Sequence, residues 1–235
     1  MKSIKTLTLV IGLLALSGVS QAQFSSTWTA VSDYDFRGFS QSAKDPAIQG
    51  SADYAFGESG FAVGAWASSS IDFGNGNDAN VELDVYAGYT GTINDTFSWT
   101  AGGNYYTYPG SDDTEDYLEV YAGFNAGNFG FKQWYTDDLF GSGVSAQYTE
   151  ANYSHPFGES PVSLGLHASY AWGDGWEDNE LIDYSVALNV SAGNFTIFGK
   201  ITGTDASGDA KITSGPNNNE VRGLIGVTTT FPWGD

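Results

Sequence analysis

The 235-residue chain contains no cysteine, and this absence excludes disulfide bridges and thiolate metal sites. Basic residues are also scarce: 8 Lys and Arg stand against 28 Asp and Glu, for a formal net charge of −20. Binding nucleic acid requires a basic surface, so we expect no nucleic-acid partner. No long apolar run follows residue 22, and the mean hydropathy is −0.22, as expected if strands alternate between apolar and polar residues and so dilute the hydropathy signal.

The N-terminal segment has the three parts of a secretory signal peptide. Lys2 and Lys5 give it a positive start, and residues 7–16 form an apolar run too short to cross a membrane as a helix. Ser20 and Ala22 are small residues that suit the −3 and −1 positions of a cleavage site. The sequence therefore predicts a signal peptide at residues 1–22 and one exported domain at residues 23–235, with an uncleaved anchor as the alternative.

Most of the remaining chain alternates between apolar and polar residues, as strands with two different faces do. Residues 81–89 show this most clearly, with Val81, Leu83 and Val85 on one face and Glu82 and Asp84 on the other. Twelve such runs are present, at residues 28–37, 48–56, 61–73, 81–89, 97–107, 117–125, 129–136, 145–154, 162–172, 182–190, 195–203 and 221–231. The first two runs have about ten residues each, the length that a tilted strand needs to cross a bilayer.

Short and long connections alternate between these runs. The short ones are residues 57–60, 90–96, 126–128, 156–161 and 191–194, and the longer, more acidic ones are residues 38–46, 74–80, 108–116, 137–144, 173–181 and 204–220. Short periplasmic turns, long external loops and an even strand number are typical of outer-membrane barrels. The sequence therefore predicts an all-β protein: a single antiparallel transmembrane β-barrel of about 12 strands in the outer membrane of a Gram-negative bacterium. A soluble β-sandwich or lipocalin-like carrier is the alternative.

Aromatic residues gather at the ends of the runs, where a membrane barrel has its two interfacial girdles. Trp28, Phe61 and Trp99 are among those beside the short connections or the termini. The girdle expected beside the long connections consists of Tyr34, Phe36, Phe73, Tyr105, Tyr170 and Trp172. In this interpretation residues 28–37 belong to the barrel wall, and residues 38–46 form an external loop.

The segment between residues 32 and 50 also carries a family resemblance. Its sequence, SDYDFRGFSQS at residues 32–42 and DPAIQG at residues 45–50, resembles that of proteobacterial outer-membrane porins known as the Gcw or TorF family. Similar pieces are ELDVYAGY at residues 82–89, YTYPG at residues 106–110 and EVYAG at residues 119–123. The resemblance implies an outer-membrane barrel that acts as a porin, and it implies no catalytic or binding residues.

The polar faces of the runs would point into the barrel. They carry the carboxylates Asp33, Asp35, Asp53, Glu82, Asp84, Glu119, Glu150 and Asp183 and the basic residues Arg37, Lys132, Lys200 and Arg222. We expect these residues to line the lumen and to pair in part, Arg37 with a neighbouring carboxylate such as Asp35.

Twelve strands lie between small barrels filled by side chains and sixteen-stranded aqueous porins. The sequence therefore predicts a narrow porin for small solutes or ions, in which the surplus of carboxylates favours cations. A salt-bridged, filled interior with a structural or surface-interaction role is the alternative. Outer-membrane lipid and lipopolysaccharide are the expected surroundings, and the oligomeric state is left open.

Candidates for catalysis are few. His155 lies beside a short connection, and His167 points inward from the middle of a run, as a satisfied polar residue would. Neither lies at the external rim, where a lipid- or peptide-cleaving barrel would need a base, so we predict no enzyme and no catalytic residue. The acidic loop segments at residues 112–116 and 174–180 lack the spacing of a helix-loop-helix calcium site. We assign no cofactor and no metal ligand; weak divalent-ion binding that bridges to lipopolysaccharide is the alternative to solvated loop charge.

Overall fold

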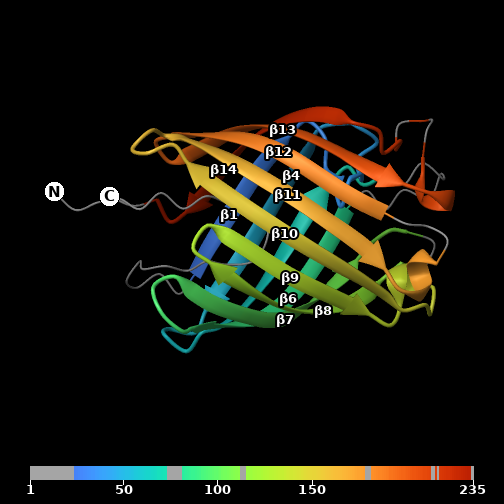
Figure 1. Ribbon diagram of the computed structural model, residues 1–235, viewed down its shortest axis with the longest axis horizontal. Helices are drawn as coiled ribbons and strands as arrows, with labels where there is room; N and C mark the ends of the chain where they lie inside the picture. Colours follow the sequence, from blue (N-terminus) through green and yellow to red (C-terminus); the bar gives the residue numbers. More distant parts are fainter. Residues whose placement is uncertain are drawn as a thin grey trace.

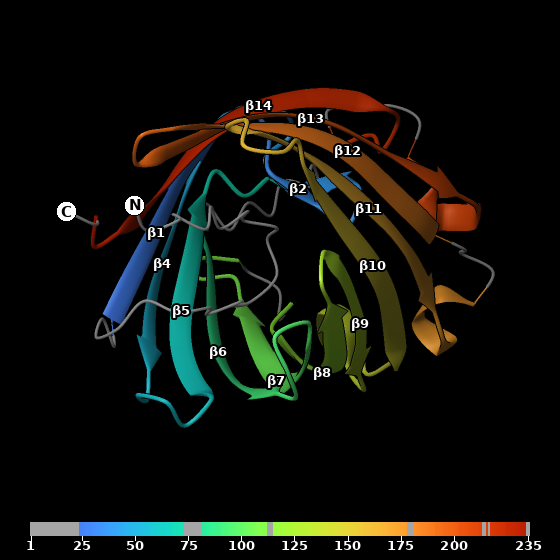
Figure 2. The ribbon, with the colours of Figure 1, turned by 60° about the vertical axis from the view of Figure 1, so that its left-hand side comes forward.

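The computed structural model describes residues 24–72, 81–111, 115–177, 181–212, 215 and 217–233. Twelve antiparallel strands form a closed barrel (Figures 1 and 2) in the order β1-β14-β13-β12-β11-β10-β9-β8-β7-β6-β5-β4. The ring closes because β1 pairs with β14 on one side and with β4 on the other. The predicted twelve-stranded antiparallel barrel is confirmed, whereas the predicted signal peptide at residues 1–22 lies outside the described residues.

The wall strands are β1 (Phe24–Val31), β4 (Ala47–Ala55), β5 (Phe61–Ser69), β6 (Val81–Thr92), β7 (Phe97–Thr107), β8 (Tyr117–Ala126), β9 (Phe129–Thr136), β10 (Ala146–Pro156), β11 (Val162–Trp172), β12 (Leu181–Ala192), β13 (Phe195–Ala206) and β14 (Arg222–Phe231). Two very short strands, β2 (Asp35–Phe36) and β3 (Phe39–Ser40), pair only with each other. Short 3₁₀ helices interrupt the long connections: η1 (Leu139–Gly141), η2 (Asp174–Trp176) and η3 (Gly208–Ala210). Nowhere in the described ranges is a helix both long and apolar enough to span a membrane.

The alternation of each strand separates an apolar outer face from a polar inner face. On β6, Val81, Leu83 and Val85 are 40, 39 and 49 % exposed, whereas Glu82 and Asp84 are 1 and 6 % exposed. Successive side chains of a strand point to opposite sides, so the exposed residues face outward and the buried carboxylates face the interior. Exposed apolar residues on other strands include Leu118, Leu166, Val186, Ile197 and Ile225. The predicted register of β6 is confirmed.

The short turns lie at one end of the barrel and the long connections at the other (Figure 1). Strand β1 begins and β14 ends at the short-turn end, where Ser26 pairs with Phe231. Exposed aromatic residues surround this end, among them Trp28, Phe61 and Trp99, as predicted for one girdle. The first and last wall strands therefore have their free ends beside the short turns, an arrangement typical of outer-membrane barrels.

The first predicted strand is wrong beyond residue 31. Strand β1 ends at Val31, and residues 32–46 enter the barrel instead of continuing its wall; Figure 2 shows β2 inside the ring of strands. Tyr34, predicted for a lipid-facing girdle, is 7 % exposed and lies against Trp66, with ring centroids 5.5 Å apart. Phe36 packs against the same interior cluster. We term residues 32–46, which contain β2 and β3, the inner hairpin.

The wall beside the inner hairpin departs from the prediction in a second place. Strand β5 ends at Ser69, and Ser70 has a φ of 65°. This turn puts Ile71 in the interior, where it is 2 % exposed, whereas strict alternation over the predicted run 61–73 would put it on the same outer face as Phe61. Tyr105, Tyr170 and Trp172 are exposed as predicted for the second girdle, and Phe73 lies outside the described residues.

Candidate functional site

The turn of the inner hairpin is formed by two residues with left-handed backbone conformations. Arg37 has a φ of 51° and Gly38 a φ of 83°. Gly38 lies so close to the wall that a Cβ atom there would come within 2.2 Å of Thr204 Cγ2 and 2.9 Å of Asp183 Cβ. Glycine is therefore required at this turn for two reasons, its backbone conformation and the lack of space.

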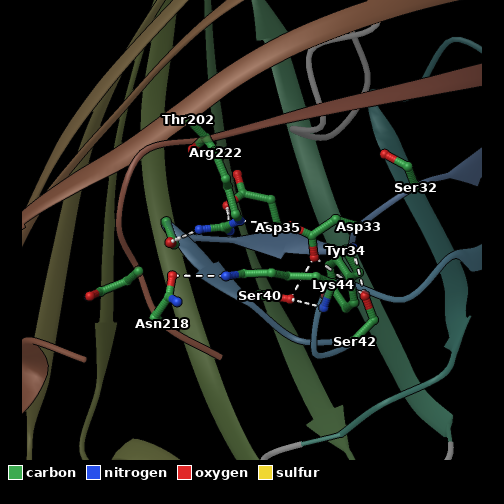
Figure 3. A network of polar contacts seen from close by, with 12 residues as sticks. Ser32, Asp33, Tyr34, Asp35, Ser40, Ser42, Lys44, Thr202, Asn218 and Arg222 are labelled. Atoms are coloured by element: carbon green, nitrogen blue, oxygen red, sulfur yellow. Dashed lines mark hydrogen bonds and ion pairs between the residues drawn. The ribbon is translucent and has the colours of Figure 1, made fainter. Parts of the chain in front are cut away.

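One side of the inner hairpin is tied to β13 and β14. Arg222 donates through Nε to Asp33 Oδ2 at 2.7 Å and through Nη1 to the Gly38 carbonyl oxygen at 2.6 Å, and it also forms an ion pair with Asp35 (Figure 3). Lys200 Nζ lies 2.6 Å from Asp35 Oδ2. Asp33 and Asp35 of the inner hairpin are therefore each neutralised by a basic residue of the wall.

The other side of the inner hairpin is tied to β8. Arg37 forms a two-pronged ion pair with Glu119, with Nη1–Oε1 and Nη2–Oε2 distances of 2.9 and 2.5 Å. The side chains of the pair are 10 and 3 % exposed. The guanidinium also lies over the Tyr148 ring, 4.0 Å from its centroid. The predicted pair between Arg37 and Asp35 is wrong, because Asp35 points to β13 and β14 and the guanidinium points away from them.

These two anchor points lie on opposite walls. In the ring of strands β14 is six places from β8, which is half of the circumference. Between the anchors, Tyr34 of the inner hairpin packs in one buried cluster with Tyr106 of β7, Tyr117 of β8 and Leu224 of β14. The inner hairpin therefore crosses the barrel interior at the end of the barrel where the long connections lie.

Most other inward charges are also satisfied by neighbours. Asp53 accepts a hydrogen bond of 2.5 Å from the Tyr86 hydroxyl. Glu150 accepts one of 2.9 Å from Trp134 Nε1 and is paired in register with Lys132, whose Nζ lies 4.8 Å from the centroid of the Trp134 ring. Each of these groups thus keeps a polar or aromatic partner inside the barrel.

His167 is a satisfied polar residue, as predicted. Its Nε2 atom lies 2.9 Å from Asp183 Oδ1, and its Nδ1 atom lies 2.8 Å from Asn152 Oδ1. The hydroxyl of Ser169 donates to Asp183 rather than to the imidazole, and the Tyr148 hydroxyl donates to the same carboxylate at 2.8 Å. The Tyr148 hydroxyl also lies 3.2 Å from His167 Nε2. These contacts hold the His167 ring in place, and no described serine hydroxyl is hydrogen-bonded to it as an activated serine would be.

Glu82 and Asp84, like Asp53, form no ion pair with any residue in the described part of the chain. Asn104 donates through Nδ2 to Asp84 Oδ2 at 3.1 Å, and the Tyr108 hydroxyl lies 3.4 Å from Glu82 Oε1. Sequence analysis missed Asn104, because an amide in an alternating run gives no signal of its own.

The twelve residues predicted to line the lumen are all buried or half-buried. The structure brings Asp33, Asp35, Lys200 and Arg222 together at one anchor and Arg37 and Glu119 at the other, and it leaves Asp53, Lys132, Glu150 and Asp183 elsewhere on the wall. Their role along a solute path stays a prediction. The acidic loop segments at residues 112–116 and 174–180 lie partly outside the described residues.

Comparison with protein families identifies the family of this chain. The model of the family Gcw_chp, described as a bacterial protein of unknown function, matches residues 15–231. This chain belongs to the Gcw_chp family. The segment that suggested a Gcw resemblance, residues 32–50, is the inner hairpin with the start of β4. No curated protein matches the chain.

Solved structures share the barrel. The structure of the KdgM porin has a TM-score of 0.57 and 12 % identity, and the alignment covers 88 % of this chain and 99 % of that one. The KdgM porin in complex with disordered oligogalacturonate has a TM-score of 0.56 and 13 % identity, with the same coverage. At such identities the likeness shows the fold alone, and this chain has a porin-like β-barrel fold.

Proposed function

We propose that this Gcw_chp protein is an outer-membrane porin of a Gram-negative bacterium, exported by a cleaved signal peptide and surrounded by outer-membrane lipid and lipopolysaccharide. It transports small solutes or ions and catalyses no reaction. The apolar outer face, the polar inner face and the porin-like fold support the proposal. The observation that carries it is the inner hairpin, an element tied by ion pairs to two opposite walls across a polar interior.

The inner hairpin is suited to control passage, because its ties are separate from the hydrogen-bond ladders that hold the wall. Every wall strand pairs with two wall neighbours, whereas β2 and β3 pair only with each other. The free energy of a buried ion pair is close to that of the two ions in water. An opening that hydrates both partners therefore costs far less free energy than a mutation that removes one partner and leaves the other charge buried. Displacement of the inner hairpin can therefore open the interior while the barrel stays intact.

The charge of the interior indicates which solutes would pass. The KdgM porin has been solved with oligogalacturonate, which is a polyanion, whereas the interior here carries eight carboxylates against four Lys and Arg. A surplus of carboxylates attracts cations and repels anions. We therefore propose cations and small neutral solutes, rather than acidic oligosaccharides, for this chain.

A filled barrel with a structural or surface-interaction role is the second candidate. The buried cluster around Tyr34, Tyr106 and Tyr117 favours it, because these rings pack across the interior. The two functions predict different conductances for a variant in which a short Gly-Ser linker replaces residues 33–45.

The test is conductance in a planar bilayer, measured for the parent protein and for this linker variant, each shown to be folded. The porin proposal predicts brief, small openings of the parent and a larger, steady conductance of the variant. If neither protein conducts, the filled barrel is correct.

A further inference from the structure

The second limb of the inner hairpin, residues 39–45, is fastened by two segments that belong to the long connections. The first is the segment that follows β5. The Asp72 amide donates to the Gln41 carbonyl oxygen at 2.8 Å, and Ser42 and Asp72 form an isolated parallel β-bridge. The limb is therefore paired side by side with the chain that continues a wall strand.

The second segment contains Asn217, in the connection between β13 and β14. Its Nδ2 atom donates to the Asp72 carbonyl oxygen at 2.5 Å and to the Ser40 carbonyl oxygen at 3.4 Å. A side-chain amide has two N–H groups, so Asn217 can serve both acceptors at once. Three segments that are distant in the sequence thus meet at one side chain.

The two residues that follow Asn217 support this contact. Lys44 Nζ of the inner hairpin donates to Asn218 Oδ1 at 2.9 Å (Figure 3). Asn219 is 3 % exposed, and its carbonyl oxygen accepts a hydrogen bond of 2.8 Å from the Thr204 hydroxyl of β13. Asn217 and Asn218 therefore reach the inner hairpin, and Asn219 holds them to the wall.

From these contacts we infer that residues 217–219, which we term the asparagine strap, are an external latch on the inner hairpin. The ion pairs of Arg222 and Lys200 hold its first limb and that of Arg37 holds its turn, whereas the asparagine strap holds its second limb. The inner hairpin leaves the interior only when both sets of contacts open. In the proposed topology the asparagine strap faces the outside, so a molecule that binds the connection between β13 and β14 would promote opening from that side.

Fastening of the second limb can be tested in detergent, without transport. Asn217 Oδ1 has no hydrogen-bond partner among the described residues, so Asn217→Asp removes both side-chain donors at an unchanged shape. It also turns a carboxylate toward two carbonyl oxygens. With a Ser42→Cys thiol as the reporter, we expect reaction with a maleimide about tenfold faster than in the protein that carries Ser42→Cys alone.

The matched control is Asn128→Asp, which makes the same change in charge at an exposed short turn. It should leave the rate of the Ser42→Cys thiol unchanged. A rate that is equal with and without Asn217→Asp, or that Asn128→Asp raises as much, overturns the latch.

Control of opening, which rests on the proposed porin function, is tested with a reversible lock. Ser42 and Asp72 are bridge partners, and neighbouring strands lie about 4.8 Å apart, within the Cα range of about 4.4–6.8 Å for disulfides. In Ser42→Cys/Asp72→Cys a disulfide, verified by mass spectrometry, should fix the inner hairpin and lower the conductance until it is reduced. Adding Asn217→Asp should raise the open fraction in the reduced protein and have no effect in the oxidised one.

The outcomes distinguish the latch from the porin function. A barrel in which Asn217→Asp exposes the thiol, but which never conducts, keeps the latch as a fastening and refutes the porin. An open fraction that Asn217→Asp leaves unchanged in the reduced protein shows that the asparagine strap does not control opening. Conductance that is the same in the oxidised and the reduced protein shows that the inner hairpin is not the gate.

Discussion

Arg37 and Glu119 are 82 residues apart in the sequence and form a two-pronged ion pair inside the barrel, with N–O distances of 2.9 and 2.5 Å. One partner belongs to the turn of the inner hairpin and the other to the wall strand β8. The pair joins the turn of the inner hairpin to β8, on the wall opposite β14, whose Arg222 holds Asp33, Asp35 and the Gly38 carbonyl oxygen. Its loss should therefore release the inner hairpin without opening the ring of strands.

We predict that Glu119→Gln releases the inner hairpin. Breaking one partner of a buried ion pair costs about 3–5 kcal/mol, because the remaining charge is left without compensation. The reporter is a thiol introduced by Ser42→Cys, at a position that is 1 % exposed in a chain without other cysteines. The thiol should react slowly with a maleimide in the parent background and much faster with Glu119→Gln.

Lys200→Gln is the control for this prediction, since Lys200 is 22 % exposed and Asp35 keeps its ion pair with Arg222. We expect only a small increase in thiol reactivity with this variant. Equal protection of the thiol in the parent and in Glu119→Gln would show that the ion pair does not hold the inner hairpin.

Gly38→Ala should increase channel opening. The added Cβ would meet Thr204 Cγ2 at 2.2 Å, and alanine is strained at a φ of 83°. Both effects act against the docked inner hairpin, so the open fraction in bilayer recordings should rise.

Gly193→Ala separates the two effects. Gly193 also has a positive φ, 62°, but no atom lies within 4 Å of an added Cβ there. This variant carries the backbone strain alone, at a short turn, and should conduct like the parent. An unchanged open fraction with Gly38→Ala would mean that the close contact at the turn does not hold the channel shut.

Val85→Arg should destabilise the membrane-embedded barrel by about 2–4 kcal/mol, because an arginine near the bilayer midplane loses hydration. Val85 is 49 % exposed on the outer face, between two inward-facing residues of β6. Urea unfolding in lipid vesicles measures the effect, with Val85→Leu as the apolar control. A Val85→Arg protein that unfolds like the parent would show that this face of β6 does not contact lipid.

The orientation in the membrane can be tested on whole cells. Ser207 is exposed at the end of the long connections and Ser160 at a short turn. We expect an impermeant maleimide to label Ser207→Cys and to leave Ser160→Cys unlabelled until the outer membrane is opened. The reverse labelling would invert the topology.

The wall of the barrel was predictable because its order comes from local alternation. The runs predicted at residues 97–107, 129–136 and 162–172 agree with β7, β9 and β11 at both ends, and Glu82 and Asp84 were correctly placed inside. In such strands a single rule, apolar outside and polar inside, fixes the register at every position.

The inner hairpin was not predictable by the same rule, because its alternation continues unbroken from Trp28 to Arg37. Partners that are distant in the sequence turn the chain inward. Arg222 lies 189 residues after Asp33, and Lys200 and Glu119 belong to other strands. A usable local signal was present, because the charged residues Asp33, Asp35 and Arg37 come directly before Gly38. Charged residues and a glycine are poorly suited to the end of a lipid-facing strand.

The last prediction concerns ion selectivity. Arg37, Lys200 and Arg222 are paired with Glu119, Asp35 and Asp33, which leaves five inward carboxylates, Asp53, Glu82, Asp84, Glu150 and Asp183, against the single basic residue Lys132. Carboxylates along a pore favour cations, and the effect weakens as the Debye length falls to about 3 Å at 1 M salt. The parent should therefore give a cation-selective reversal potential in a KCl gradient at low salt, and a smaller one at high salt.

Neutralising the unpaired carboxylates tests the origin of this preference. Glu82→Gln/Asp84→Asn should move the reversal potential toward zero, whereas Glu58→Gln/Asp95→Asn, with the same change in charge at the short turns, should move it much less. Glu119→Gln differs from both, because it frees the positive charge of Arg37 and should shift selectivity toward anions. An anion-selective parent, or a potential that is the same in the parent and in Glu82→Gln/Asp84→Asn, would show that these two carboxylates do not set the selectivity of the pore.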